Sequence, residues 1–458
     1  MLFPQNPAAM IDYSLLFAVF AGIALLLFLI LYFKIQAFLA LLMASIAVAL
    51  LAGMPAADII TNIQAGMGGT LGFIAIVVGL GAMFGALLES SGGVQALAAY
   101  ILDKTGEKQA SWAMVVTGFL VAIPVFFDVG FVILVPIVYA LQKKTGKSVL
   151  FYGIPLLSGL AITHAFIPPT PGPVAVADIL GADLGWVIAI GVIAGIPAAV
   201  VSGPLFGRYI ASRIHVEAVT EAEQAAKPIE LPSPGLVGGL IGLPLVLILL
   251  NTLLNSPLFS DAPLPDYLLR GLAMLGHPFI ALIIANLFAW YYLGLRKGFS
   301  KSQLLELSSK SLGPAGLIIL ITGAGGVFKQ ILTEIGAGKM LAEVMASYGF
   351  SALVVAFLTA AAIRVLQGSS TVAMITAAGI TAAFLEGGGY SEVQRALLVI
   401  AIASGASILS HVNDSGFWLV SKYFGLTEQQ TLRSWTVVTT LIALVGFITV
   451  LLLNLVVA

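Results

Sequence analysis

A histidine and four prolines lie within one otherwise apolar stretch of the chain, from Gly159 to Pro173. Each proline removes a backbone hydrogen-bond donor, and polar groups left unsatisfied in hydrocarbon are costly. Such a break is tolerated in a membrane only where it is buried in protein or lines a wet cavity. Interrupted spans of this kind hold substrates and ions in transporters, so Thr163, His164 and Thr170 are candidate polar contacts of a transport site.

A second interrupted stretch, SHVNDSG, contains His411, Asn413, Asp414 and Ser415. Its side chains supply donors and acceptors from a different part of the chain, and we expect them to contact the same substrate. His164 and His411 are candidates for proton coupling, because histidine titrates near physiological pH. The alternative for either residue is a histidine that is only hydrogen-bonded.

The polar run QGSST interrupts a third apolar stretch. The start of a half-helix favours an anion through its free amides and its dipole, and hydroxyl groups suit a polyol chain. The alternative is that serine and threonine only satisfy the backbone of a broken helix. The candidate substrate contacts here are Gln367, Gly368, Ser369, Ser370 and Thr371.

Two charged residues occur within apolar surroundings close to these interruptions. Asp128 follows Phe126 and Phe127, where burial favours the neutral form of a carboxyl group and suits a proton carrier. A helix N-cap is the alternative for this residue. Arg364 stays charged at physiological pH, and we expect it to pair either with a substrate carboxylate or with Asp414 in a structural salt bridge.

The composition predicts the class of protein that must position these residues. The chain is 60% hydrophobic and only 9% charged, which is typical of an all-helical polytopic membrane protein. The absence of cysteine excludes disulfides, thiolate metal sites and cysteine catalysis, and the four histidines are widely spaced, so we expect neither a metal nor a cofactor. A net charge of -1 argues against a nucleic-acid partner.

Apolar stretches of about 20 residues predict eight uninterrupted spans. They are Tyr13 to Phe33, Ala37 to Gly53, Gly69 to Leu88, Trp186 to Gly207, Gly235 to Leu254, Leu272 to Leu293, Gly313 to Leu332 and Thr436 to Val457. The first should remain as a helix rather than a cleaved signal peptide, because no basic residue precedes it.

Four further stretches are interrupted. Trp112 to Leu141 and Ser351 to Leu385 have arms that reach only about 20 to 25 Å, short of a hydrocarbon core of about 30 Å, and are predicted to be re-entrant hairpins. Leu150 to Leu180 and Ala396 to Phe424 are predicted to be broken spans. About ten spans and two hairpins result.

The two halves of the chain resemble each other. Residues 69–98 placed on residues 313–342, an offset of 244, match at ten of thirty positions, where chance predicts about three. Each half has an odd number of crossings, which predicts two repeats of inverted topology. The predicted units are a first repeat over 1–207, a linker over 208–234 and a second repeat over 235–458.

The distribution of basic residues predicts the orientation. With the N-terminus outside, fifteen of the 20 lysines and arginines fall on inner loops, and Arg270, Lys339 and Arg395 fall on outer loops. Lys329 and Arg364 remain at membrane depth. The positive-inside rule therefore predicts an external N-terminus and a cytoplasmic linker. Lys329 is a possible second anion contact, with a side chain that reaches the membrane interface as the alternative.

Five motifs, in this order over nearly the whole chain, resemble the gluconate permease family of proton symporters: FFDVGFVILVP, SGLAITHAFIPPTPGP, GAGGVFKQIL, QGSSTVAMITAAGI and ILSHVNDSGFWLVSKYFGLT. The resemblance implies membership of the ion transporter superfamily, a homodimer in the bacterial inner membrane, and import of gluconate or a related hydroxylated carboxylate with a proton. Some relatives take D-serine or short hydroxy acids. Thr170 replaces the usual histidine of PPHPGP, which bears on the substrate, and Asp128 replaces the glutamate of some relatives.

The rival hypothesis from another class is an intramembrane hydrolase that uses Ser410 or Ser404 with His411. A hydrolase predicts asymmetric halves, whereas polar interruptions occur in both halves here. A channel is a weaker alternative, because no ring of like charges or filter sequence is present. We therefore expect a secondary active transporter rather than an enzyme, with the lipid bilayer, a small carboxylate and a proton as its partners.

Overall fold

The computed structural model describes residues 13–106, 109–218, 231–254, 265–337, 351–385, 389–411 and 414–457, and these residues form helices and connecting turns. Within this described part, seven helices are long and apolar enough to cross a membrane. The protein is thus a multi-pass α-helical membrane protein, as the composition predicts.

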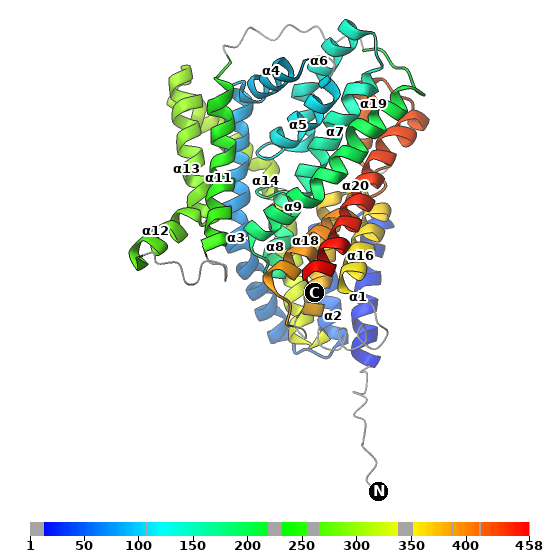
Figure 1. The fold of residues 1–458 in the computed structure, drawn as a ribbon. Coiled ribbons are helices and arrows are strands. Elements are labelled where there is room, and N and C mark those ends of the chain that lie inside the picture. Colours follow the sequence, from blue (N-terminus) through cyan, green and yellow to red (C-terminus); the bar gives the residue numbers. More distant parts are fainter. Residues whose placement is uncertain are drawn as a thin grey trace.

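The first half of the chain contains ten α-helices and one π-helical turn (Figure 1). They are α1 (Tyr13–Leu31), α2 (Ala37–Leu51), α3 (Ala56–Ser90), α4 (Gly93–Thr105), α5 (Ala110–Val121), α6 (Phe127–Thr145), α7 (Val149–Phe166), α8 (Pro171–Leu180), α9 (Leu184–Val200), the turn Val201–Leu205 and α10 (Phe206–Ala211).

The second half repeats this order from α14 onward. Its described elements are α11 (Pro234–Leu254), α12 (Asp266–Gly276), α13 (Pro278–Ala289) with its continuation to Lys297, α14 (Lys301–Glu334), α16 (Ala352–Gln367), α17 (Ser370–Leu385), α18 (Glu392–Gly405), α19 (Ser415–Phe424) and α20 (Glu428–Val457).

The helix boundaries in the two halves correspond at the offset that the sequence comparison indicated. Helices α8 and α19 both have ten residues, and their first residues, Pro171 and Ser415, are 244 positions apart. Helices α3 and α14 end at Ser90 and Glu334, again 244 apart. The same interruptions therefore recur at equivalent places in both halves.

All four predicted interruptions are present as helix breaks. Helix α5 gives way to α6 over residues 122–126, and α7 gives way to α8 over residues 167–170. In the second half, α16 and α17 are separated by only Gly368 and Ser369, and Gly368 has a φ of 89° that favours glycine. Helices α18 and α19 are separated by residues 406–414.

Three of the ten predicted spans are not among the seven helices of spanning length in the described part, namely α1, α2 and the broken span of α18 and α19. Helices α1 and α2 are shorter than the seven candidates, and α2, with 15 residues, is only about 22 Å long. The predicted span from Leu272 to Leu293 is wrong in its bounds. His277 caps α13 by accepting a hydrogen bond from the Phe279 amide at 3.3 Å, so the spanning helix begins at Pro278.

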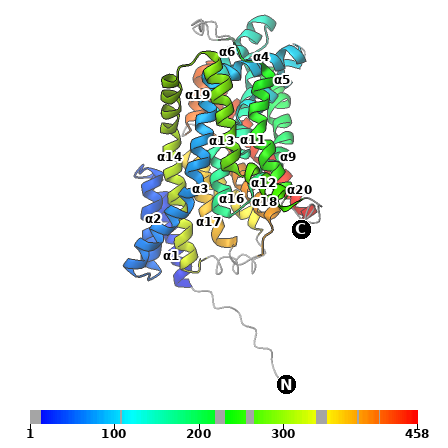
Figure 2. The ribbon, with the colours of Figure 1, turned by 90° about the vertical axis from the view of Figure 1, so that its left-hand side faces the viewer.

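Two of the spans are far longer than predicted. Helices α3 and α14 have 35 and 34 residues, and they lie side by side along the length of the molecule (Figure 2). A Cβ atom on Gly66 would lie 2.8 Å from the Gly326 carbonyl oxygen, so the two backbones touch there. Gly66 and Gly326 therefore serve close helix packing, whereas a Cβ atom added to Gly68, Gly69 or Gly72 would have nothing within 4 Å.

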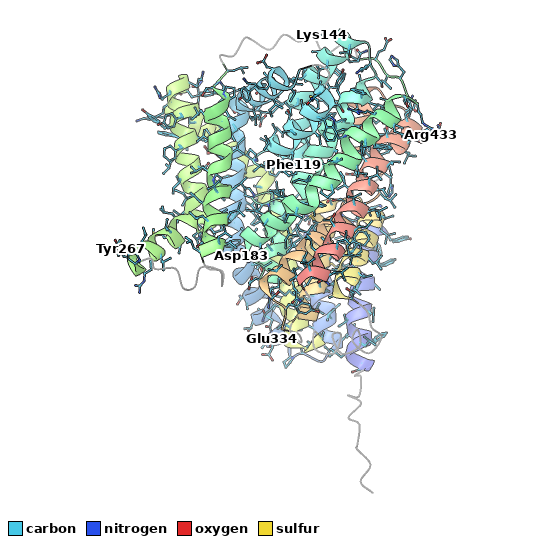
Figure 3. The ribbon with its side chains drawn as sticks, in the orientation of Figure 1. Phe119, Lys144, Asp183, Tyr267, Glu334 and Arg433 are labelled. Atoms are coloured by element: carbon cyan, nitrogen blue, oxygen red, sulfur yellow. The ribbon has the colours of Figure 1, made fainter. Side chains whose placement is uncertain are left out.

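The residues predicted to face opposite sides of the membrane lie at opposite ends of the molecule. Lys144 and Arg433 lie at the end nearest α4 and α6, whereas Asp183, Tyr267 and Glu334 lie toward the other end (Figure 3). The side of the membrane that each end faces stays a prediction.

The segment predicted as a solvated linker, 208–234, is partly packed against the protein. Ser148 Oγ donates to the Ile214 carbonyl at 2.9 Å and accepts a hydrogen bond from the Val216 amide at 3.1 Å. Residues 219–230 lie outside the described part. The first part of the linker is therefore fixed to the start of α7.

Candidate functional site

One cavity, of about 670 Å³, collects polar side chains from both halves of the chain. It is lined by the starts of α6, α17 and α19, the break between α16 and α17, and parts of α7, α14 and α20. Ten of the predicted site residues lie on its wall: Asp128, His164, Arg364, Gln367, Gly368, Ser369, Ser370, Thr371, Asp414 and Ser415.

Arg364 and Asp414 form a buried ion pair at the cavity wall. Arg364 Nη2 donates to Asp414 Oδ2 at 2.5 Å, and the two side chains are 5% and 14% exposed. The structural salt bridge considered from the sequence is therefore present. Arg364 Nε and Nη1 are also buried, and neither has a hydrogen-bond partner within the described part of the chain. The pair thus leaves two guanidinium donors unused.

The break between α16 and α17 both satisfies the helix backbone and places polar side chains on the cavity wall, the two roles considered for the run QGSST. Ser369 Oγ accepts a hydrogen bond from the Val372 amide at 3.3 Å and so caps the start of α17. Gln367 Oε1 is buried and has no donor among the described residues. Ser370 and Thr371 line the cavity in the first turn of α17, where amide groups are free. Only part of this polar run is therefore occupied in satisfying the helix.

Asp128 does not cap a helix. Helix α6 begins at Phe127, its N-cap residue is Phe126, and no side chain bonds to its first amides. The Asp128 side chain is exposed to the cavity, and the charge of Asp414 acts on it electrostatically. A carboxyl group of the first half thus shares the cavity with the ion pair of the second half.

His164 lies on the same wall. Its ring approaches the ring of Phe126 edge-on, with centroids 6.3 Å apart, and its Nδ1 atom is buried with no partner among the described residues. Asp128, Arg364 and His164 therefore bring three ionisable groups to one space.

Three predicted residues, Thr163, Thr170 and His411, do not line this cavity. Thr163 Oγ1 donates to the Phe119 carbonyl at 2.8 Å, and Thr170 Oγ1 donates to the Ile167 carbonyl at 2.5 Å, so both hydroxyls satisfy broken backbone. His411 Nε2 lies 2.9 Å from the Val365 carbonyl oxygen. Asn413 lies outside the described residues.

Phe119, the partner of Thr163, lies about midway between the two ends of the molecule (Figure 3). The α7 break therefore begins near the middle of the fold. Lys329, the possible second anion contact, is not on the cavity wall, and its charge acts on Asp178 of α8 instead.

Several cavity residues were not predicted from the sequence. Pro314 and Ile318 come from α14, and Ser407, Trp435 and Thr439 come from α18 onward. Trp435 stacks on Phe127 with ring centroids 5.4 Å apart. The sequence around Trp435 gives little indication that it belongs to a site, because the residues that it contacts are distant in the chain.

The contacts of Ser410 do not form a nucleophile and base pair. Ser410 Oγ donates to Asp414 Oδ2 and accepts a hydrogen bond from Trp435 Nε1, whereas the His411 ring contacts the Val365 carbonyl. Ser410 thus donates its hydrogen bond to a carboxylate, and His411 faces a carbonyl group. This arrangement does not match the geometry of nucleophilic catalysis, which needs the serine hydroxyl within hydrogen-bond reach of the base.

Comparison with known proteins agrees with this geometry. A family model described as GntP family permease matches residues 13–456. The gluconate permease of Pseudomonas aeruginosa is 40% identical over 437 residues, which cover 94% of this chain and 95% of the relative. The low-affinity gluconate transporter of Escherichia coli K12 is 39% identical, with 95% and 97% of the two chains covered.

Among solved structures, the YdaH transporter of Alcanivorax borkumensis has a TM-score of 0.60 at 17% identity, with 86% of this chain and 88% of that chain covered. This likeness concerns the fold alone. The family model and the relatives span nearly the whole chain, and they confirm the resemblance that the five motifs indicate. The chain belongs to the GntP family of permeases.

Proposed function

We propose that the protein imports gluconate, or a closely related small hydroxylated carboxylate, together with a proton across the bacterial inner membrane. Membership of a permease family supports transport, and the names of the two relatives given above support gluconate as the first substrate to test. The cavity supplies the chemistry on which the proposal rests.

The observation that carries the proposal is a set of unused polar atoms at one cavity. Arg364 and Gln367 line the cavity, and Arg364 Nε, Arg364 Nη1 and Gln367 Oε1 are buried without a hydrogen-bond partner among the described residues. Buried polar atoms without partners are costly, so a ligand that satisfies them gains more than it would in water. A carboxylate can accept hydrogen bonds from the guanidinium N–H groups, and hydroxyl groups fit Gln367, Ser370 and Thr371.

Charge balance supports coupling to a proton. Among the described residues of the wall, the charged or titratable side chains are Arg364, Asp128, Asp414 and His164. Arg364 already neutralises Asp414, so a substrate carboxylate would add a second negative charge beside Asp128. An uncompensated charge within a membrane protein is expensive. A proton on Asp128 removes this cost when the anion enters, which ties the two movements together.

The proposed architecture is a pair of inverted repeats, with α5–α6 and α16–α17 as re-entrant hairpins and α7–α8 and α18–α19 as broken spans. The matched helix boundaries support the repeat, and the basic residues support an external N-terminus with a cytoplasmic linker. A homodimer is included on the strength of the family resemblance. Alternating access would then expose one central cavity to each side in turn.

The test is uptake of radiolabelled gluconate into proteoliposomes with the pH outside lower than inside. We expect accumulation above the equilibrium level, and collapse of that accumulation when a protonophore removes the gradient. Competition by unlabelled L-idonate, lactate and D-serine would define the substrate class. Gluconate uptake that neither accumulates nor responds to the pH gradient would contradict the proposed symport, and no gluconate uptake at all would contradict the substrate.

A further inference from the structure

A chain of hydrogen bonds links Asp414 to the start of α20 through Ser410. Trp435 Nε1 donates to Ser410 Oγ at 2.7 Å, and Ser410 Oγ donates to Asp414 Oδ2. Asp414 Oδ2 also accepts the hydrogen bond from Arg364 Nη2. Ser410 is fully buried and Trp435 is 3% exposed, so bulk water does not compete for these contacts.

The chemistry of the donors fixes the direction of every bond in this chain. An indole N–H and a guanidinium group can only donate. Ser410 Oγ must therefore accept from Trp435, and its own hydrogen is directed to Asp414. The other carboxylate oxygen, Asp414 Oδ1, accepts the Gly416 amide at 3.0 Å. Three donors thus hold the carboxylate in one orientation.

The backbone of Ser410 is held on α20 as well. Its amide donates to Thr439 Oγ1 at 3.1 Å, and its carbonyl oxygen accepts a hydrogen bond from Thr436 Oγ1. Ser410 belongs to the break between α18 and α19, where regular helical bonds are missing. Hydrogen bonds from α20 therefore hold Ser410 in place, although Ser410 lies in a helix break without regular helical hydrogen bonds.

We propose that Trp435 and Ser410 are positioning residues for the anion site, an inference that rests on the proposed function. Trp435 orients Ser410, Ser410 orients Asp414, and Asp414 holds Nη2 of Arg364. The guanidinium plane is then fixed before the substrate arrives, while Nε and Nη1 have no partner among the described residues. A guanidinium group that is already oriented loses less freedom when it binds a carboxylate, which raises affinity.

The variant Trp435→Phe tests the first bond of the chain. Phenylalanine keeps an aromatic ring to stack on Phe127 but removes the indole N–H. The second variant, Ser410→Ala, removes both hydrogen bonds of the hydroxyl. Binding of gluconate to the purified protein is measured by calorimetry, and gluconate exchange is measured in proteoliposomes.

We expect Ser410→Ala to weaken gluconate binding by about tenfold to a hundredfold, the usual effect of one lost hydrogen bond to a charged group. Trp435→Phe should weaken binding by about tenfold or less, because Ser410 keeps its bond to Asp414. The maximal exchange rate at saturating gluconate should stay close to the wild-type rate in both variants. The double variant should bind no more weakly than Ser410→Ala, because Trp435 acts through Ser410.

Two control variants match these changes in chemistry. Trp186→Phe alters a tryptophan at the start of α9, and Thr440→Val removes a hydroxyl of α20 that donates to the Thr436 carbonyl at 2.7 Å. Both should bind gluconate as the wild type does.

Wild-type affinity in folded Ser410→Ala and Trp435→Phe proteins would overturn the positioning role and leave the proposed function intact. Additive losses in the double variant, or a loss confined to the maximal rate, would also overturn it, since a merely structural residue gives that result. If the wild-type protein itself does not bind gluconate, the proposed function fails, and this inference fails with it.

Discussion

Thr170 and Asp414 occupy equivalent positions, 244 residues apart, each directly before the first residue of a ten-residue helix. Asp414 caps its helix through the Gly416 amide and pairs with Arg364, whereas the Thr170 hydroxyl donates to the nearby Ile167 carbonyl. The two halves therefore have the same helix boundaries here, but the N-cap residue is charged only in the second half. The charged cap lies at the cavity, and the neutral cap does not.

Replacing Arg364 should remove the carboxylate contact. Removing one partner of a buried ion pair is expected to cost about 3 to 5 kcal/mol of stability, so Arg364→Ala is informative only if the protein remains folded. Arg364→Lys keeps the charge and loses the fork, and we expect it to weaken gluconate binding by at least about tenfold. Detergent melting and calorimetry on the same preparation separate the two effects. Unchanged affinity in a folded Arg364→Ala protein would remove Arg364 from the site.

Asp128→Asn should separate exchange from accumulation. Asparagine imitates the neutral acid permanently, so the variant should exchange gluconate down its gradient but lose uptake driven by a pH gradient. The control is Asp103→Asn, an exposed carboxyl group of α4 that should leave both processes unchanged. Survival of pH-driven uptake in Asp128→Asn at the wild-type rate would direct the search to His164, which lies on the same wall.

The proposed topology places Thr145 and Ser309 in the cytoplasm and Ser260 and Gly388 outside. The chain has no native cysteine, so single cysteines at these positions can be labelled without background. Ser260 and Gly388 lie outside the described residues, and labelling needs no structure there. An impermeant maleimide should reach the two pairs from opposite sides of the membrane. Labelling of Thr145 and Ser260 from the same side would rule out the inverted repeats.

Gly326→Val should destabilise the protein strongly, because a Cβ atom there would lie 2.1 Å from Thr70 Oγ1 and 2.8 Å from the Gly66 carbonyl oxygen. Overpacking of this kind costs about 1 to 3 kcal/mol or more, because two helix backbones must separate. The matched control is Gly316→Ala on the same helix, where nothing lies within 4 Å of the added atom. Melting in detergent should show a lower midpoint for the first variant only.

The helix breaks could be predicted because their residues are unsuited to a helix. Prolines mark the break after Phe166, and Gly368 with its neighbouring hydroxyls marks the break after Gln367. The full length of α3 could not be predicted, since polar residues such as Asp58 and Asn62 lower the hydropathy of its first turns. Those turns lie beyond the apolar stretch yet continue the same helix.

The polar character of the site was also visible in the sequence, but its contacts were not. The sequence makes Thr170 and Asp414 equal candidates for substrate contact, and only the three-dimensional arrangement shows that the Thr170 hydroxyl satisfies the local backbone. Trp435 could not be predicted as a site residue, because its partner, Ser410, is 25 residues away in the break between α18 and α19, whereas Trp435 lies within α20. A tertiary hydrogen bond of this kind leaves no periodic pattern in the chain.

Asp128 on the cavity wall has no salt-bridge partner within the described part of the chain, and this has a consequence for energetics. If Asp128 is the group that changes its charge, each cycle moves one anion with one proton, and no net charge crosses the bilayer. A membrane voltage is worth about 2.3 kcal/mol per charge per 100 mV, and it would then do no work on transport. Uptake would follow the difference in acidity alone, and it would persist in a cell whose membrane is depolarised but whose interior remains alkaline.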